Sequence, residues 1–291
     1  MGNGPMKKVA IATDTTACIS PEQFEKNGVE QVPMFIIFGD KVFRDGIDIT
    51  PSEFYTLQRQ AKKLPTTSHP TPEAFLEAYR KASKKASGIL CITISHKFSA
   101  TFNSAKVAME MAKETMPNVV IEILDCGTAA AAQGLIILAA ARAAAAGAGL
   151  PEVIETAKSV MSRVNLVATL DTLRYLVKGG RVPKAAAFIG SILQIKPIFA
   201  VADGEAHPVT NARTTSGAMR ALLKLIEQKS VKGKPLHAAV MHADALDRAI
   251  TLKNEINSRF KCTELFITEF TPVMGVHTGP GVIGVAFYSE D

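Results

Sequence analysis

The sequence predicts an α/β protein with two domains. Apolar, β-branched runs alternate with helical patterns over residues 7–165, which is typical of a mainly parallel sheet with helices on both faces. Within this region the turn pair Gly39-Asp40 separates two short apolar runs and indicates a small β insertion. Further along, Asp203-Gly204 is a strong hairpin signal among other strands and helices. We therefore expect an N-terminal α/β/α domain over residues 7–165 and a C-terminal α+β domain with a mixed sheet over residues 166–291.

Capping residues mark where the N-terminal helices begin. Ser20-Pro21, Thr50-Pro51 and Thr71-Pro72 each place a hydroxyl cap before a proline, which is tolerated at the first helical position. The elements expected in this half are a strand at 7–13, a helix after Ser20, the insertion at 31–38 and 41–43, helices at 50–63 and 72–85, a strand at 88–94 leading into a helix, a strand at 119–124, and helices at 129–148 and 151–163.

The segment 129–148 consists almost entirely of alanine and aliphatic residues, and its length suggests a membrane span. Gln133 and Arg142 interrupt it, and alanine contributes little to insertion. Thr128 and Gly147 stand where the caps of a packed helix belong. We therefore expect a helix that lies close against the sheet and not an integral membrane protein, with transient membrane contact left open.

The C-terminal half mixes hairpin and crossover connections. A helix through Lys178 stops at Gly179-Gly180, and the hairpin follows some twenty residues later. The elements expected here are a strand at 166–169, the helix to 178, a segment at 185–193, strands at 195–202 and 206–212, a helix at 215–228, a strand at 236–242, a helix at 244–259, and strands at 264–271 and 282–288.

Composition excludes several function classes. The net charge of +6 is modest, and the chain has no Trp and four Tyr, so nucleic-acid binding is not favoured. Its four cysteines form no C-x-x-C pair, which argues against disulfides and structural zinc and fits a reducing cytoplasm. No P-loop or G-x-G-x-x-G occurs, so we expect no ATP site in this chain.

Two hydroxyl-rich loops are the strongest candidates for a binding site. The loop after the strand at 88–94 offers Ser95, Ser99 and Thr101 at a helix start, where free N–H groups and hydroxyls favour a small anion. A second loop, Thr66 to Thr71, also precedes a helix. A third polar loop lies between residues 274 and 281. The alternative interpretation is that Ser99 or Thr101 simply caps its helix.

Six motifs in a fixed order carry a family resemblance. The chain resembles the DegV family of bacterial fatty-acid-binding proteins, which includes the acyl-carrier subunit of fatty acid kinase, a part of phospholipid metabolism. The resemblance runs from about Val9 to the end. The motifs are Thr13-Asp14-Thr15-Thr16-Ala17, Thr67-Ser68-His69-Pro70-Thr71-Pro72, Ile94 to Phe102, Leu173 with Lys178-Gly179-Gly180-Arg181, Ile195-Lys196-Pro197-Ile198 with Asp203-Gly204, and His277-Thr278-Gly279-Pro280-Gly281.

The resemblance implies a ligand and its contacts. A long-chain fatty acid would lie between the two domains, with its carboxylate held by Thr67, Ser99 and His277 and with Ser68 as an alternative hydroxyl. No cofactor is implied. The sequence departs from the family's usual residues at three positions: His69 replaces a glutamine, His96 a serine and Ala100 a glycine. The two histidines could make the site more basic or sensitive to pH.

The resemblance also implies a protein partner. A kinase subunit with its own ATP site would phosphorylate the bound carboxylate to an acyl phosphate, so this chain would be a carrier and not an enzyme. The sequence contributes a basic cluster, Arg174, Lys178, Arg181 and Lys184. We expect Arg181, with Lys178 and Arg213, to form the surface that docks this partner.

Two other chemistries have the right residue types. A serine hydrolase would use Ser99 as nucleophile and His277 as base, but Ser99 lies in no G-x-S-x-G elbow and no acidic residue stands beside His277. A metal site at His69 and His96 lacks an identifiable third ligand. Hydroxyls and one imidazole can hydrogen-bond a carboxylate, but they offer no fixed positive charge for a free phosphate.

Overall fold

The computed structural model describes residues 7–182 and 195–291. Its first sheet contains four strands in the order β2-β1-β6-β7, and every neighbouring pair is parallel. This confirms the predicted parallel sheet. The bounds are β1 (Lys7–Asp14), β2 (Val29–Val32), β6 (Ala86–Thr93) and β7 (Val120–Asp125).

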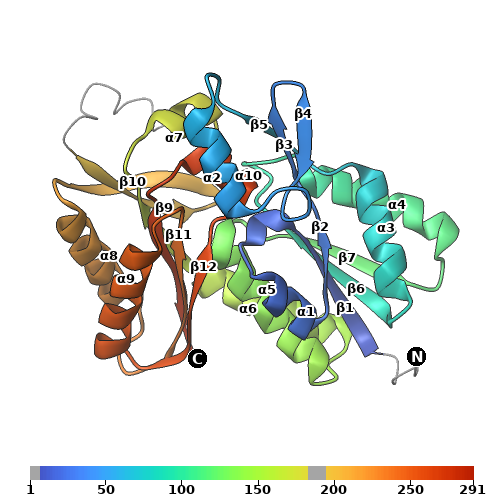
Figure 1. The fold of residues 1–291 in the computed structure, drawn as a ribbon. Coiled ribbons are helices and arrows are strands. Elements are labelled where there is room, and N and C mark those ends of the chain that lie inside the picture. Colours follow the sequence, from blue (N-terminus) through green and yellow to red (C-terminus); the bar gives the residue numbers. More distant parts are fainter. Residues whose placement is uncertain (1–6, 183–194) are drawn as a thin grey trace.

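Helices cover both faces of this sheet (Figure 1). One face packs against α3 (Pro72–Ser83) and α4 (Thr101–Thr115), and the other against α5 (Ala130–Ala145) and α6 (Leu150–Arg163). Successive residues of a strand point to opposite faces, so Ala10 of β1 joins the first core and Ile11 the second. Ala10 shares the first core with the aromatic rings of Phe75 and Tyr79 in α3.

The N-terminal helices begin at the predicted caps. Ser20 caps α1 (Pro21–Asn27), Thr50 caps α2 (Pro51–Gln60) and Thr71 caps α3, each through its hydroxyl oxygen. A one-turn helix, η1 (Thr15–Ala17), follows β1. The expected cap of the alanine-rich helix is wrong, because Ala129 and not Thr128 is the N-cap of α5.

The β insertion is a three-stranded antiparallel sheet with the order β4-β3-β5. It consists of β3 (Phe35–Phe38), β4 (Lys41–Arg44) and β5 (Thr66–Ser68). Two expectations were wrong here. The run at 31–38 is not one strand, because Pro33 lacks an N–H and separates β3 from β2 of the main sheet. Residues 66–68, expected in a loop, pair with β3 instead.

The C-terminal sheet is mixed, as predicted, with the order β10-β9-β8-β13-β11-β12. Only β11 and β12 pair in parallel; the other pairs are antiparallel. Asp203 and Gly204 form the predicted hairpin turn, with φ of 52° and 74°. The strands are β8 (Asn165–Thr169), β9 (Lys196–Ala202), β10 (Glu205–Ala212), β11 (Leu236–His242), β12 (Cys262–Glu269) and β13 (Ile283–Ser289).

Within residues 166–182 and 195–291, four helices accompany this sheet. α8 (Thr215–Lys229) and α9 (Leu246–Arg259) pack on its outer face, and the short α7 (Arg174–Gly179) and α10 (Pro272–Thr278) lie near the insertion (Figure 1). The loop expected at 274–281 is wrong over most of its length, because residues 274–278 belong to α10. Thr271-Pro272 is a helix start signal that the prediction did not take into account. The predicted segment 185–193, like Lys184, lies outside the described residues.

The alanine-rich α5 lies between the two sheets. Most of its side chains are buried, and its core also includes Met241 of β11 and Ala286 of β13. Small side chains let both sheets approach the helix closely, and the two halves of the chain consequently share one continuous hydrophobic core. Among the described helices, none is long and apolar enough to cross a membrane.

Candidate functional site

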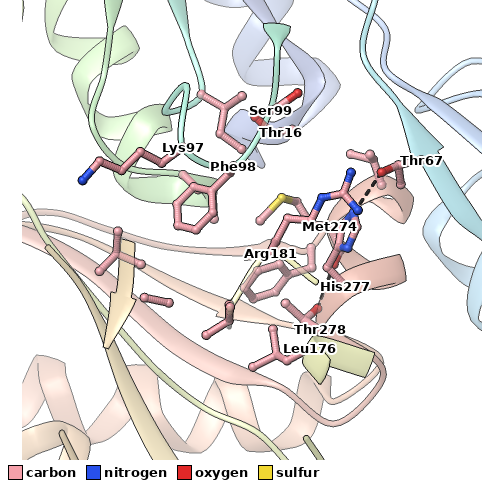
Figure 2. Close-up of a pocket in the computed structure, with 18 of the residues that line it drawn as sticks. Thr16, Thr67, Lys97, Phe98, Ser99, Leu176, Arg181, Met274, His277 and Thr278 are labelled. Atoms are coloured by element: carbon pink, nitrogen blue, oxygen red, sulfur yellow. Dashed lines mark hydrogen bonds between the residues drawn. The ribbon is translucent and has the colours of Figure 1, made fainter. Parts of the chain in front are cut away.

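A cavity of about 420 Å³ lies between the two halves of the molecule (Figure 2). Thr16 follows β1 and Ile94 follows β6, so one wall of the cavity is formed at the carboxyl ends of the parallel strands. This is the edge where open α/β sheets commonly bind ligands. β5, α7, α10 and the inner face of the C-terminal sheet complete the lining.

Apolar side chains form most of the cavity wall. The C-terminal sheet contributes Ala168, Phe199 and Val201, and Leu176 of α7 lies close by. On the N-terminal side, Phe98 points into the cavity (Figure 2). A surface of this kind holds an elongated apolar ligand by excluding water and cannot by itself select a head group.

The polar side of the cavity is centred on a pair of residues from opposite ends of the chain. Thr67 of β5 and His277 of α10 are hydrogen-bonded, with 2.9 Å between Oγ1 and Nε2 (Figure 2). Pairing with β3 positions Thr67, and the last turn of α10 positions His277. The structure thus brings together two of the residues that the sequence proposed for a carboxylate.

The His277 ring is packed tightly and held neutral. Burial, together with the charge of Arg181, lowers its pKa to about 4. The other ring nitrogen, Nδ1, is buried without a partner among the described residues. A side chain at Gly179 would place a Cβ 2.5 Å from this nitrogen. Glycine at this position of the Lys178-Gly179-Gly180-Arg181 motif therefore has a steric cause.

Arg181 lines the same cavity and lies beside His277 (Figure 2). Its Nη1 donates a hydrogen bond to the Gly179 carbonyl at 2.7 Å. Arg181 therefore adds a fixed positive charge to the cavity, which the hydroxyls and the imidazole named from the sequence do not supply. The sequence placed Arg181 on a docking surface because it stands in a basic cluster; the structure shows it exposed and also lining the cavity.

Ser99 lines the cavity, but its hydroxyl already has a local partner. It lies 2.8 Å from the Thr101 hydroxyl and accepts the Thr101 N–H at 3.3 Å. Neither residue is the N-cap of α4, which is Ala100 and makes no side-chain bond. Thr101 is fully buried, with its Oγ1 3.5 Å from the sulfur of Met34. Ser99 thus satisfies the free N–H of the first residue of α4, as the helix-cap interpretation expected, although it is not the N-cap itself, whereas Thr101 does not cap the helix.

Three predicted hydroxyls, those of Thr101, Ser95 and Ser68, lie outside the cavity lining. Ser95 is buried and donates to the Gly204 carbonyl at 3.3 Å. This bond connects the loop between β6 and α4 to the β9–β10 hairpin. Lys97 in the same loop reaches Glu205 at 3.3 Å. Ser68 points away from Thr67, as alternate residues of a strand do, and its hydroxyl lies 3.4 Å from the His69 carbonyl.

Sequence reasoning missed a buried network beneath the cavity. Asp14 is fully buried and accepts the N–H groups of Thr16 at 3.0 Å and Ile94 at 2.9 Å. Gln133 of α5 donates to the same carboxyl at 3.3 Å, and burial raises the Asp14 pKa. This network joins the ends of β1 and β6, which lead into η1 and into the loop before α4. The sequence signal for this network was Asp14, an acidic residue directly after the strand expected at 7–13.

The two loop histidines do not form a metal site. His69 and His96 both line the cavity, but His96 is paired with the carboxyl group of Asp125. Within residues 7–182 and 195–291, no group of three or more His, Cys, Asp or Glu side chains could hold a metal ion. Lys178 and Arg213 are exposed and outside the cavity lining; Lys178 lies on α7, and Arg213 between β10 and α8.

The DegV family model matches residues 8–290. The chain belongs to the DegV family. A DegV domain-containing protein of Streptomyces coelicolor is 35% identical over 287 residues, covering 98% of this chain and 99% of the relative. The family assignment made from the six motifs is therefore confirmed.

Solved DegV structures share the whole fold. A DegV family protein from Thermus thermophilus, described as binding fatty acid, superposes with a TM-score of 0.90 at 28% identity, covering 97% of this chain and 100% of that one. DegV of Bacillus subtilis, described as a fatty acid binding protein, gives 0.87 at 29% identity, with 98% and 100% covered. These DegV proteins bind fatty acids, and nothing in the comparisons supports the serine hydrolase alternative.

Proposed function

We propose that this protein binds a long-chain fatty acid in the cavity between its two halves and presents it to a separate kinase subunit. Thr67, Ser99 and His277 would hold the carboxylate, and the apolar wall would hold the acyl chain. The observation that carries the proposal is the Thr67–His277 pair at the polar side of an otherwise apolar cavity. The fatty acids bound by the two similar DegV structures support it.

The state of His277 suits a carboxylate. Its Nδ1 has no partner among the described residues and its Nε2 faces Thr67, so we assign the single proton of the neutral ring to Nε2. If a carboxylate oxygen replaces the Thr67 oxygen as the acceptor of that N–H, the N–H and the Thr67 hydroxyl can both donate to the ligand. A carboxylate beside the ring would also raise the pKa of His277, so a proton can be taken up on binding.

The acyl chain would supply most of the affinity. Burying about sixteen carbons at about 0.8 kcal/mol per methylene gives roughly 12 kcal/mol before the costs of immobilisation. Each hydrogen bond to the ionised carboxylate adds about 1.5 to 3 kcal/mol. The polar residues would therefore set the orientation of the ligand and the identity of its head group.

The kinase step is supported by the family resemblance and by one feature of the site. Arg181 brings a fixed positive charge to the cavity. Such a charge suits a carboxylate and, still better, the acyl phosphate that phosphorylation would produce. The sequence has no P-loop, so phosphoryl transfer would require a partner with its own ATP site.

Lipid analysis tests the binding proposal directly. The protein is purified from a bacterial host, denatured and extracted, and the extract is examined by mass spectrometry for acyl lipids. Delipidated protein is then titrated with palmitate and oleate. We expect about one acyl chain per protein and saturable binding. Repeated extracts without acyl lipid, together with no binding of either added acid, would reject the proposal.

A further inference from the structure

We propose that Asp45 is a positioning residue for His277: by accepting the Val273 N–H at the start of α10, it holds the imidazole where the ligand head group would meet it. Asp45 belongs to the segment after β4, in the N-terminal half, whereas α10 belongs to the C-terminal half. The effect on ligand binding rests on the proposed function, but the effect on the His277 ring does not.

The first turn of α10 needs an acceptor from elsewhere. A helix start leaves N–H groups without partners, and a Ser or Thr N-cap commonly accepts one of them. The N-cap Thr271 makes no such bond. Instead, Oδ1 of Asp45 accepts the Val273 N–H at 3.2 Å, across 228 positions of the chain. Asp45 is fully buried, so water cannot replace this bond.

α2, which follows the Asp45 segment, makes a second contact with α10. Nε2 of Gln58 in α2 donates to the Gly275 carbonyl at 3.1 Å. A side chain at Gly275 would come within 2.7 Å of Phe54 and 2.8 Å of the Tyr55 hydroxyl. α10 therefore lies against α2 with no spare room, and Asp45 fixes its leading end.

Displacement of α10 would act directly on the site. Val273 and His277 are one helical turn apart, and both line the cavity. Thr67, the hydrogen-bond partner of His277, lies on β5 of the insertion, and Asp45 directly follows β4 of the same insertion. The insertion thus supplies one head-group residue and anchors the helix that carries the other, so a change at Asp45 would separate the pair.

A double-mutant cycle tests this role. Palmitate affinity is measured for the wild type, Asp45→Ala, His277→Ala and the double variant. We expect Asp45→Ala to weaken binding about tenfold in the wild-type background and less than about twofold in the His277→Ala background. Asp45→Asn keeps an oxygen acceptor and should bind within about twofold of wild type. If Asp45→Ala does not fold, the cycle is run with Asp45→Ser, whose shorter side chain withdraws the acceptor.

Asp48→Ala is the matched control. Asp48 lies in the same segment, but its carboxyl group binds Arg44 at the surface, so palmitate affinity should not change. Equal losses from Asp45→Ala in both backgrounds would mean that Asp45 supports the cavity in general and would overturn the proposal. Unchanged affinity in Asp45→Ala would overturn it as well.

A ligand-free measurement separates this proposal from the proposed function. The His277 ring is followed by NMR against pH in delipidated protein. In Asp45→Ala we expect its titration midpoint to rise toward the ordinary histidine value, because a displaced ring gains water, whereas Asp45→Asn should match wild type. An unchanged midpoint in Asp45→Ala overturns the positioning role. If wild type binds no palmitate, the proposed function fails, and this titration alone decides the role of Asp45.

Discussion

The Thr67 hydroxyl and the His277 imidazole lie 2.9 Å apart, although 210 positions separate them in the chain. The contact joins the β insertion of the N-terminal half to α10 of the C-terminal half. A ligand head group placed here would touch both halves at once. Binding and the relative position of the two halves should therefore be coupled through this pair.

Removing one hydroxyl should separate head-group recognition from chain binding. We expect Thr67→Val and Ser99→Ala to weaken fatty acid binding about 5-fold to 150-fold, since a buried carboxylate short of a donor costs about 1 to 3 kcal/mol. The matching fatty alcohol carries no charge and should lose much less. Calorimetric titration with both ligands measures the difference.

Thr56→Val is the control for these two substitutions. Its hydroxyl bonds to the Ser52 carbonyl on the exposed side of α2, away from the cavity, so neither ligand should bind differently. Equal losses for acid and alcohol in Ser99→Ala or Thr67→Val would remove that residue from the head-group site.

Gly179→Ala should disturb the site through His277. The new Cβ would lie 2.5 Å from Nδ1 of the ring, so the ring must move, which disturbs its hydrogen bond to Thr67. We expect palmitate affinity to fall about 5-fold or more. Gly180→Ala is the comparison: with φ of 68° it should cost about 1 kcal/mol of stability, but its Cβ would meet nothing within 4 Å. If both variants bind palmitate as wild type does, His277 does not contact the ligand.

His277 should make stability depend on pH. Its pKa is about 4 in the folded protein and 6.5 ordinarily, so the unfolded chain takes up a proton first as pH falls. The stability that His277 contributes is therefore complete above pH 6.5 and is lost as pH falls toward 4, by roughly 3 kcal/mol at most. His277→Gln cannot take up this proton. Denaturant unfolding of both proteins from pH 7.5 to 4.5 should give curves that converge or cross.

The comparison of wild type with His277→Gln is needed because Asp45 also titrates in this pH range. Burial raises its pKa to about 7, so it destabilises the folded protein when ionised and less so as pH falls. In the wild type alone the two groups act in opposite directions, and the net slope says little about either. Parallel pH profiles for wild type and His277→Gln would show that His277 titrates normally in the folded state.

The docking role of the basic residues can now be tested without disturbing the cavity. Lys178 is exposed on α7, close in sequence to Arg181 but outside the cavity lining. If this surface meets an acidic kinase subunit, Lys178→Glu should slow acyl phosphate formation at low salt and leave palmitate affinity unchanged. Arg181→Glu should reduce both. Unchanged kinase rates in Lys178→Glu and Arg213→Glu would exclude these two residues from docking.

Esterase activity should be absent. His277 bonds to Thr67, Ser99 bonds to Thr101, and a ring with a pKa of about 4 is a weak general base at neutral pH. We expect no turnover of a nitrophenyl ester beyond the rate without protein. Turnover that disappears in Ser99→Ala would revive the hydrolase interpretation.

The fold class, the starts of three N-terminal helices and the family could be predicted from the sequence alone. The local signals were the periodicity of apolar residues, the capping hydroxyls and the first-turn prolines. They located the starts of α1, α2 and α3 at Ser20, Thr50 and Thr71. The hairpin at Asp203-Gly204 followed from the same kind of local chemistry. Thr67, Ser99 and His277 were named from motifs, and the structure brings all three to one cavity.

Only the tertiary structure decided which side chains face that cavity. Ser95 and Ser99 are both serines of one loop, yet one fastens the β9–β10 hairpin and the other lines the cavity. Arg181 is exposed and also lines the cavity, and Asp45 accepts an N–H from a helix 228 positions away. Such contacts depend on how distant segments pack, and neighbouring residues along the chain carry no record of them.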